Sequence, residues 1–203
     1  PVPESLYRGQ PGFGDQIAPE VFALILAWGV GLWAVFGIAI ARTVGSSGRT
    51  GINEVEQSYL ELIERARRSI YIENQYFTAR ALGDALAARL EEEQGPDIVL
   101  VLPRQTGGWL EQMTMDVLRG RIVDRMRRAD QHDRLRIYFP HQPGLGDDCI
   151  SVHAKLLIVD DRLLRIGSSN TSNRSMGLDT ECDLAIESRE PDDRIAGREV
   201  GHL

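Results

Sequence analysis

The sequence predicts an α/β fold in which a mixed β-sheet is flanked by helices. Short runs rich in β-branched residues follow, in turn, longer stretches whose apolar residues recur at helical spacing. Strands that alternate with helices in this way form a sheet that the helices cover. The length of 203 residues suits one domain with a sizeable core, and 42% hydrophobic and 26% charged residues are usual for a globular protein.

The N-terminal part of the chain is expected to be a loop followed by an apolar segment. Residues 1–19 are rich in Gly and Pro and show no periodicity. Residues 21–41 carry no charge and are long enough to cross a bilayer, although Trp28 and Trp33 lie in the middle of the run and not at its ends. The other interpretation, which stays open beside a membrane-embedded helix, makes residues 36–42 a buried strand.

Residues 38–203 are expected to form the folded domain, whereas 1–37 are a loop and apolar segment whose role stays open. Helices are indicated by an N-cap at Asn53 and by inward-facing apolar residues, which are Val55, Tyr59, Ile63, Ala66, then Leu82, Leu86, Leu90, then Leu110, Met113, Val117 and Met126. The last of these helices is predicted at 109–130. Strands are predicted at 69–73, 97–103, 134–139, 151–159, 163–166 and 181–187. The strand at 97–103 has the apolar run that is typical of burial on both faces.

Polar residues with fixed spacing lie in and after the hairpin predicted at 151–166. His153 and Lys155 alternate with apolar residues, so strand geometry brings the imidazole and the ammonium to the same face. The turn and the end of the second strand add Asp160, Gly167, Ser168 and Asn170. A buried polar pair would leave a basic group beside a histidine without a purpose, so the pattern favours a functional site.

These six residues, in the order H-x-K-x4-D-x6-G-S-x-N, match the signature of the phospholipase D superfamily without a departure. Each specified residue has a chance of roughly one in twenty at average usage, so accidental agreement is remote. Residues 70–77 and 173–187 resemble the segments beside the second catalytic motif of two-motif phospholipases D, and the residues around Trp109 resemble the same bacterial group. The resemblance covers roughly residues 38–187 and implies one half of that family's α/β sandwich.

One departure from the family pattern concerns the number of motifs. Relatives of this kind carry two H-x-K motifs in two similar halves that share an active site, and this sequence has one. The chain therefore resembles the C-terminal catalytic half of a bacterial phospholipase D. The resemblance implies that the site is complete only with a second motif, which comes from a partner half or from a dimer mate, as in small single-motif bacterial endonucleases.

The resemblance also implies the chemistry, which is hydrolysis or transfer of the phosphatidyl group through a phosphohistidine. Histidine suits attack on phosphorus and protonation of the leaving alcohol because its pKa lies near working pH. His153 is the expected acid in a paired enzyme, and takes both roles in a symmetric dimer. Lys155, Ser168 and Asn170 are expected to bind the substrate phosphate, although Ser168 also suits a turn.

Other residues are expected to support this site. Glu181 is the expected acceptor that orients the imidazole, and Asp179 is close enough in sequence to replace it. Asp160 and Gly167 are expected to fix the motif structurally. Asn74 and Gln75 are expected either to line the pocket or to have a structural role where a strand ends.

No cofactor and no metal is expected, because H-x-K offers one good ligand and the lysine repels a cation. A net charge of −7 argues against nucleic acid as a partner. Five arginines at 119–128 are the exception, and we interpret them as a solvated helix face. The expected partners are a phospholipid substrate and a membrane surface, on the cytoplasmic side of a bacterium. A homodimeric endonuclease, a cardiolipin synthase-like phosphatidyltransferase and a non-catalytic half-domain stay open as alternatives.

Overall fold

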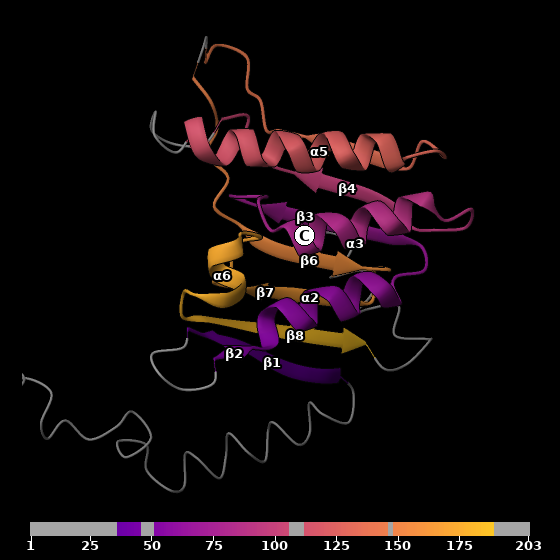
Figure 1. The fold of residues 1–203 in the computed structure, drawn as a ribbon, viewed down its shortest axis with the longest axis vertical. Helices are drawn as coiled ribbons and strands as arrows, with labels where there is room; N and C mark the ends of the chain where they lie inside the picture. The colour runs from indigo at the N-terminus through magenta and orange to yellow at the C-terminus, as the bar shows by residue number, and fades with distance from the viewer. Residues whose placement is uncertain (1–35, 46–50, 106–111, 146–147, 189–203) are drawn as a thin grey trace, which may run out of the picture. The chain divides into compact units, whose positions relative to one another are not determined.

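The computed structural model describes residues 36–45, 51–105, 112–145 and 148–188 (Figure 1). In this part, the strands form one eight-stranded sheet with the order β2-β1-β8-β7-β6-β3-β4-β5. They are β1 (Phe36–Val44), β2 (Ile52–Asn53), β3 (Ser69–Asn74), β4 (Asp97–Val101), β5 (Leu135–Tyr138), β6 (Lys155–Val159), β7 (Leu163–Gly167) and β8 (Glu181–Ser188). The described helices are α2 (Glu54–Arg65), α3 (Arg80–Glu91), the π-helical turn η3 (Gln112–Asp116), α5 (Val117–Ala129) and α6 (Asn173–Gly177).

The sheet is mixed, which confirms the predicted fold class. Strands β3, β4 and β5 pair in parallel, whereas β6 pairs antiparallel with both β3 and β7. Figure 1 shows α2, α3 and α5 lying along one face of this sheet. The alternation of strands and helices in the sequence therefore corresponds to helices that pack on a central sheet.

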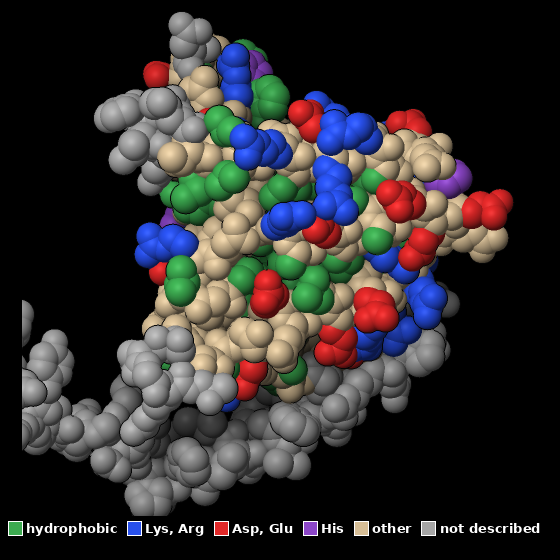
Figure 2. Space-filling view, viewed as in Figure 1, with side chains coloured by type: hydrophobic (Ala, Val, Ile, Leu, Met, Phe, Trp, Pro, Cys, Tyr) green, Lys and Arg blue, Asp and Glu red, His purple; other side chains and the backbone are tan. Residues whose placement is uncertain are grey.

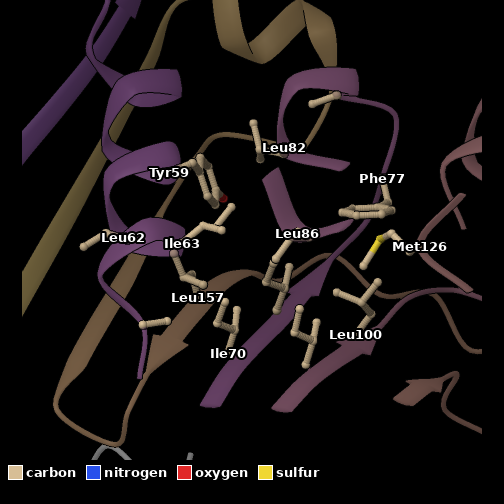
Figure 3. Close-up of a cluster of buried hydrophobic side chains, with 14 of the residues drawn as sticks. Tyr59, Leu62, Ile63, Ile70, Phe77, Leu82, Leu86, Leu100, Met126 and Leu157 are labelled. Atoms are coloured by element: carbon tan, nitrogen blue, oxygen red, sulfur yellow. The ribbon is translucent and has the colours of Figure 1, made fainter. Parts of the chain in front are cut away.

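The hydrophobic core lies between these helices and the sheet (Figure 3). The side chains that meet there come from α2, α3, α5 and three strands, and none is more than 1% exposed: Tyr59, Ile63, Leu82, Leu86, Met126, Ile70, Leu100 and Leu157. Burying one large apolar side chain contributes about 1.5–3 kcal/mol. The inward-facing residues predicted for the first two helices, from Val55 to Leu90, are likewise no more than 1% exposed, which confirms those predictions.

Two details of the predicted helices are wrong. Asn53 precedes α2, but its side chain accepts a hydrogen bond from Gln57 Nε2 at 3.0 Å and does not cap a backbone N–H. Val117 was expected to face inward and is 51% exposed. The π-helical turn before it explains the error, because its wider hydrogen-bonding pattern shifts the helical phase. Trp109, Leu110 and the side chain of Met113 lie outside the described part.

Three details of the predicted strands also differ. A strand does begin at Phe36, but Ile40 is 66% exposed, because β1 lies near the edge of the sheet beside the two-residue β2. On β4, Ile98 and Leu100 are fully buried whereas Val99 is only half-buried, so one face alone is fully covered. Strand β6 begins at Lys155, so His153 precedes the strand and does not lie within it.

The apolar run at 21–41 is described only from Phe36 onward, where it forms β1. Trp28, Trp33 and the rest of residues 1–35 lie outside the described part, so the division at residue 37 stays a prediction. Among the described helices, none is both long and apolar enough to cross a bilayer.

Candidate active site

The residues of the signature, apart from Asp160, meet at one end of the sheet because of strand direction. Strand β6 is antiparallel to its neighbours β3 and β7, and β7 is antiparallel to β8. The start of β6, the ends of β3 and β7, and the start of β8 therefore lie at the same end. This end carries His153 and Lys155, the segment from Gly167 to Asn170, Glu181, and Asn74 with Gln75.

Lys155 is half-buried at the start of β6. Its Nζ donates to Gln75 Oε1 at 3.3 Å and to the carbonyl oxygen of His153 at 3.0 Å. An ammonium has three N–H donors, so one stays available for a substrate oxygen. Burial lowers the pKa of Lys155, and the nearby charge of Glu181 partly counters this effect. Gln75 is thereby placed in the site as a partner of the lysine.

His153 is exposed, and among the described residues its imidazole has no hydrogen-bonding partner. Glu181, which was expected to orient the ring, is 9% exposed and accepts a hydrogen bond from the hydroxyl of Ser168. The structure thus brings Glu181 to the same end of the sheet as His153 but pairs it with Ser168. The Ser168 oxygen also accepts the backbone N–H of Cys182 at 3.1 Å.

The segment from Gly167 to Asn170 packs against β8 and the end of β3. A Cβ on Gly167 would lie 1.9 Å from Asp183 Oδ1, so only glycine fits there. Ser169 donates its backbone N–H, at 3.1 Å, and its hydroxyl to the same carboxylate. Asn74 is fully buried, and its Oδ1 accepts the Thr171 N–H at 3.2 Å. Asn74 also donates to the carbonyl oxygen of Ser169 at 3.4 Å, so it binds the backbone of this segment.

Asn170 follows directly. Its backbone N–H donates to Ser175 Oγ at 3.1 Å, which fixes the residue against α6. Its side-chain oxygen is buried and has no hydrogen-bond partner in the described part of the chain. A buried polar atom without a partner is costly and is often found at functional sites. This oxygen is an acceptor, so the contact that it lacks is one with a donor, whereas the NH₂ group of the same side chain can donate to a substrate oxygen.

Asp160 lies at the opposite end of the hairpin, away from the site. Asp160 and Asp161 both have φ of 56°, and Arg162 N–H bonds to Val159 O at 3.1 Å, as in a type I′ turn. The Asp160 carboxylate accepts the backbone N–H groups of three consecutive residues from Arg67 to Ser69 at 2.6–2.9 Å. Burial is the largest single influence and raises its pKa, but these bonds and Arg68 together hold the pKa of Asp160 below its usual value.

Asp179 is held elsewhere. Its Oδ1 accepts from Arg174 Nη2 at 2.8 Å, within the turn that follows α6. Among the described residues, no group of three or more His, Cys, Asp or Glu side chains is arranged to hold a metal ion.

Two supporting residues were not found from the sequence. Arg165 and Asp183, both 2% exposed, form an ion pair between β7 and β8, and the Arg165 guanidinium carbon lies 3.5 Å from the Tyr59 ring centroid. Because Asp183 also holds Ser169, this pair links the core to the site. A signal existed: Arg165 takes an inward position in the otherwise apolar run L-L-R-I, which requires a buried partner.

Comparisons with known proteins identify relatives of the chain. A family model described as "Cardiolipin synthase, PLD-like domain" matches residues 59–197. Phospholipase D1 of Cricetulus griseus is 27% identical over 168 residues, and phospholipase D zeta 1 of Arabidopsis thaliana is 30% identical over 205 residues. These matches cover 65% and 78% of this chain but 16% and 19% of the two relatives, so the chain spans less than a fifth of their length.

Solved structures share the fold. The phospholipase D family member Nuc from Salmonella typhimurium has a TM-score of 0.56 at 17% identity, and covers 82% of this chain and 91% of its own. Phosphatidylserine synthase of Haemophilus influenzae has a TM-score of 0.61 at 18% identity, over 82% of this chain and 38% of its own. With the family model matching more than half of its residues, the chain belongs to the phospholipase D superfamily, a family of phosphodiesterases and phosphatidyltransferases.

Proposed function

We propose that the chain hydrolyses or transfers the phosphatidyl group of phospholipids through a phosphohistidine intermediate. The observation that carries the proposal is that an exposed, unpaired imidazole, an ammonium with a free donor and Asn170, whose side-chain NH₂ group is a donor, lie at the same end of the sheet. A nucleophile beside cationic and neutral donors is what phosphoryl transfer requires.

In the proposed reaction, one histidine nitrogen attacks phosphorus as the bond to the head-group oxygen breaks. That oxygen takes a proton from a second histidine. Water or another alcohol then attacks the phosphohistidine, gives its proton to the second histidine, and releases phosphatidic acid or a new phosphatidyl ester. Lys155 and Asn170 hold the phosphoryl oxygens throughout, where negative charge is concentrated.

Two histidines are needed, and the chain has one H-x-K motif. We therefore propose that the second comes from a partner half or from a second copy of the chain. The proposal includes action at a membrane surface, since the substrate is a lipid.

The test measures head-group release from short-chain phosphatidylcholine and phosphatidylglycerol, with the full chain alone and with a complete partner half. Release that disappears in His153→Ala supports the proposal. His132→Ala is the matched control, because His132 is also exposed but has no lysine two residues later. If neither lipid yields His153-dependent release with the partner half present, the proposal is wrong. DNA binding at low salt serves as the check on the endonuclease alternative.

A further inference from the structure

Helix α5 is strongly basic in a chain that is acidic overall. It contains five arginines and a single acidic residue, Asp124, although the whole chain has a net charge of −7. Figure 2 shows Lys and Arg side chains gathered over α5 and on the surface between α5 and α3. The sequence indicates a solvated helix face, but the structure separates these arginines into groups with different surroundings.

Three of the five arginines face a cavity between α5 and α3. Arg121, Arg125 and Arg128 line it together with Arg80 of α3, and its volume is about 390 Å³. Arg119 points elsewhere, where it donates to the carbonyl oxygens of Pro103 at 2.8 Å and Arg104 at 3.1 Å. We call this cavity, with its four arginines Arg80, Arg121, Arg125 and Arg128, the arginine cavity.

The charge of the arginine cavity is poorly neutralised. Asp84 is the one carboxylate among its described lining residues; it pairs with Arg125 and lies 3.6 Å from Arg80. Arg121 and Arg128 have no ion-pair or hydrogen-bond partner in the described part of the chain. Four guanidinium groups against one carboxylate leave an excess of positive charge that suits a phosphate group, which arginine binds with paired N–H donors.

The other residues that line the arginine cavity indicate which class of molecule bears the phosphate group. Leu118, which is 40% exposed, and Ile122 contribute apolar surface, and Val117 beside them is 51% exposed. Basic residues next to exposed apolar residues on one helix are typical of binding at a lipid surface. Single-stranded nucleic acid is favoured instead by aromatic side chains on which bases stack, and the described lining contains none.

The arginine cavity also adjoins the start of α6, which follows the candidate active site. Asn173, three residues after Asn170, is part of the lining; its Oδ1 accepts the Arg80 backbone N–H at 3.3 Å and its Nδ2 donates to Thr78 O at 3.1 Å. We propose that the arginine cavity binds the phosphate groups of anionic phospholipids and holds the domain at a bilayer surface. This binding is separate from catalysis and stands whether or not the chain turns lipid over.

The test measures binding of the full chain to vesicles of phosphatidylcholine, with and without phosphatidylglycerol. The variant Arg121→Ala/Arg128→Ala removes two unpaired arginines of the cavity. Arg67→Ala/Arg127→Ala is its matched control, because it removes the same charge from exposed positions outside the lining. Circular dichroism checks that both variants are folded.

We expect binding to the phosphatidylglycerol vesicles alone, weakening as salt is raised. Each arginine near an anionic surface raises the affinity for the membrane about fivefold. The affinity of the cavity variant for these vesicles should therefore fall about 20- to 30-fold, and that of the control variant should fall much less. Equal losses in both variants would overturn the proposal, as would no vesicle binding by the wild-type chain. Cavity-dependent binding of inorganic phosphate without vesicle binding would also overturn it, and so would DNA binding that is stronger than vesicle binding and depends on the same two arginines.

Discussion

The hydroxyl of Ser168 donates a hydrogen bond to the carboxylate of Glu181, which lies on the neighbouring strand β8. The same oxygen accepts the backbone N–H of Cys182 at 3.1 Å, so the serine is held from two sides. Glu181 also raises the pKa of Lys155 against the effect of burial. One carboxylate thus positions the Gly-Ser-x-Asn segment and helps to keep the lysine protonated.

Replacing Glu181 by Gln keeps the shape of the side chain and removes its charge. Since that charge raises the pKa of Lys155, its loss should lower this pKa further, and the alkaline limb of the head-group release profile should move to lower pH. The measurement is the pH dependence of kcat. Asp179→Asn removes an equal charge nearby in the sequence, but from a pair with Arg174, and should leave the limb where it is. If the alkaline limb of the Glu181→Gln profile stays at the same pH as in the wild type, the charge of Glu181 does not influence the pKa of Lys155 as expected.

Gly167→Ala should disrupt the segment from Gly167 to Asn170 in the candidate active site. Its Cβ would lie 1.9 Å from Asp183 Oδ1 and 2.6 Å from Asp183 Cα, so strand β7 or β8 has to shift. We expect the free energy of unfolding to fall by about 1–3 kcal/mol or more, as for other overpacked sites. Chemical denaturation measures it. Gly120→Ala is the control: a Cβ there meets nothing within 4 Å, and in a helix it should stabilise by about 0.5–1 kcal/mol.

Asp183→Asn should be among the most destabilising single changes at this end of the sheet. It leaves the Arg165 guanidinium, 2% exposed, without its counter-charge. Removing one partner of a buried ion pair costs about 3–5 kcal/mol. Denaturant unfolding of the variant measures the loss. Asp133→Asn removes the carboxylate from the exposed pair with Arg136 and should have almost no effect. Similar losses of unfolding free energy in the two variants would show that the buried Arg165–Asp183 ion pair contributes little to stability.

Asp160→Asn should give a pH-dependent loss of stability. The pKa of Asp160 is lower in the folded chain than its usual value of 3.8, so its carboxylate stabilises the fold above that value, and the contribution disappears as pH falls through the lowered folded pKa. At neutral pH we expect a loss of about 1–2 kcal/mol, reduced from the full worth of charged hydrogen bonds because the turn is partly exposed. Asparagine tolerates the positive φ, so the backbone is retained.

Unfolding midpoints of the two proteins across acid pH check this expectation. The difference between wild type and Asp160→Asn should be constant near neutrality and should shrink in strong acid. A difference that does not depend on pH would mean that the carboxylate charge is not what stabilises the turn.

The sequence was most informative where one local rule decided the outcome. Helical spacing, for example, identified the buried residues Tyr59 and Leu86. It failed where tertiary structure intervened. The π-helical turn rotated Val117 outward, and the pairing of Arg165 with Asp183 depends on two strands that only the fold brings together.

The arginines of α5 illustrate the same limit. Periodicity places them on a helix but cannot show that Arg80, on α3, faces the same cavity as Arg121. Likewise, the alternation around His153 suggested a strand, whereas regular pairing begins only at Lys155. The signature residues could be identified from the sequence alone, but the contacts that hold them could not.

We propose that one chain supplies half of a two-histidine site. The most direct measurement is head-group release per mole of protein over a dilution series that extends to concentrations at which the chain is shown to be monomeric. We expect the monomer to release no more head group than His153→Ala does, and any activity to appear only when a second motif is supplied by another copy or by a partner half. Constant His153-dependent release per mole down to the monomer would contradict it.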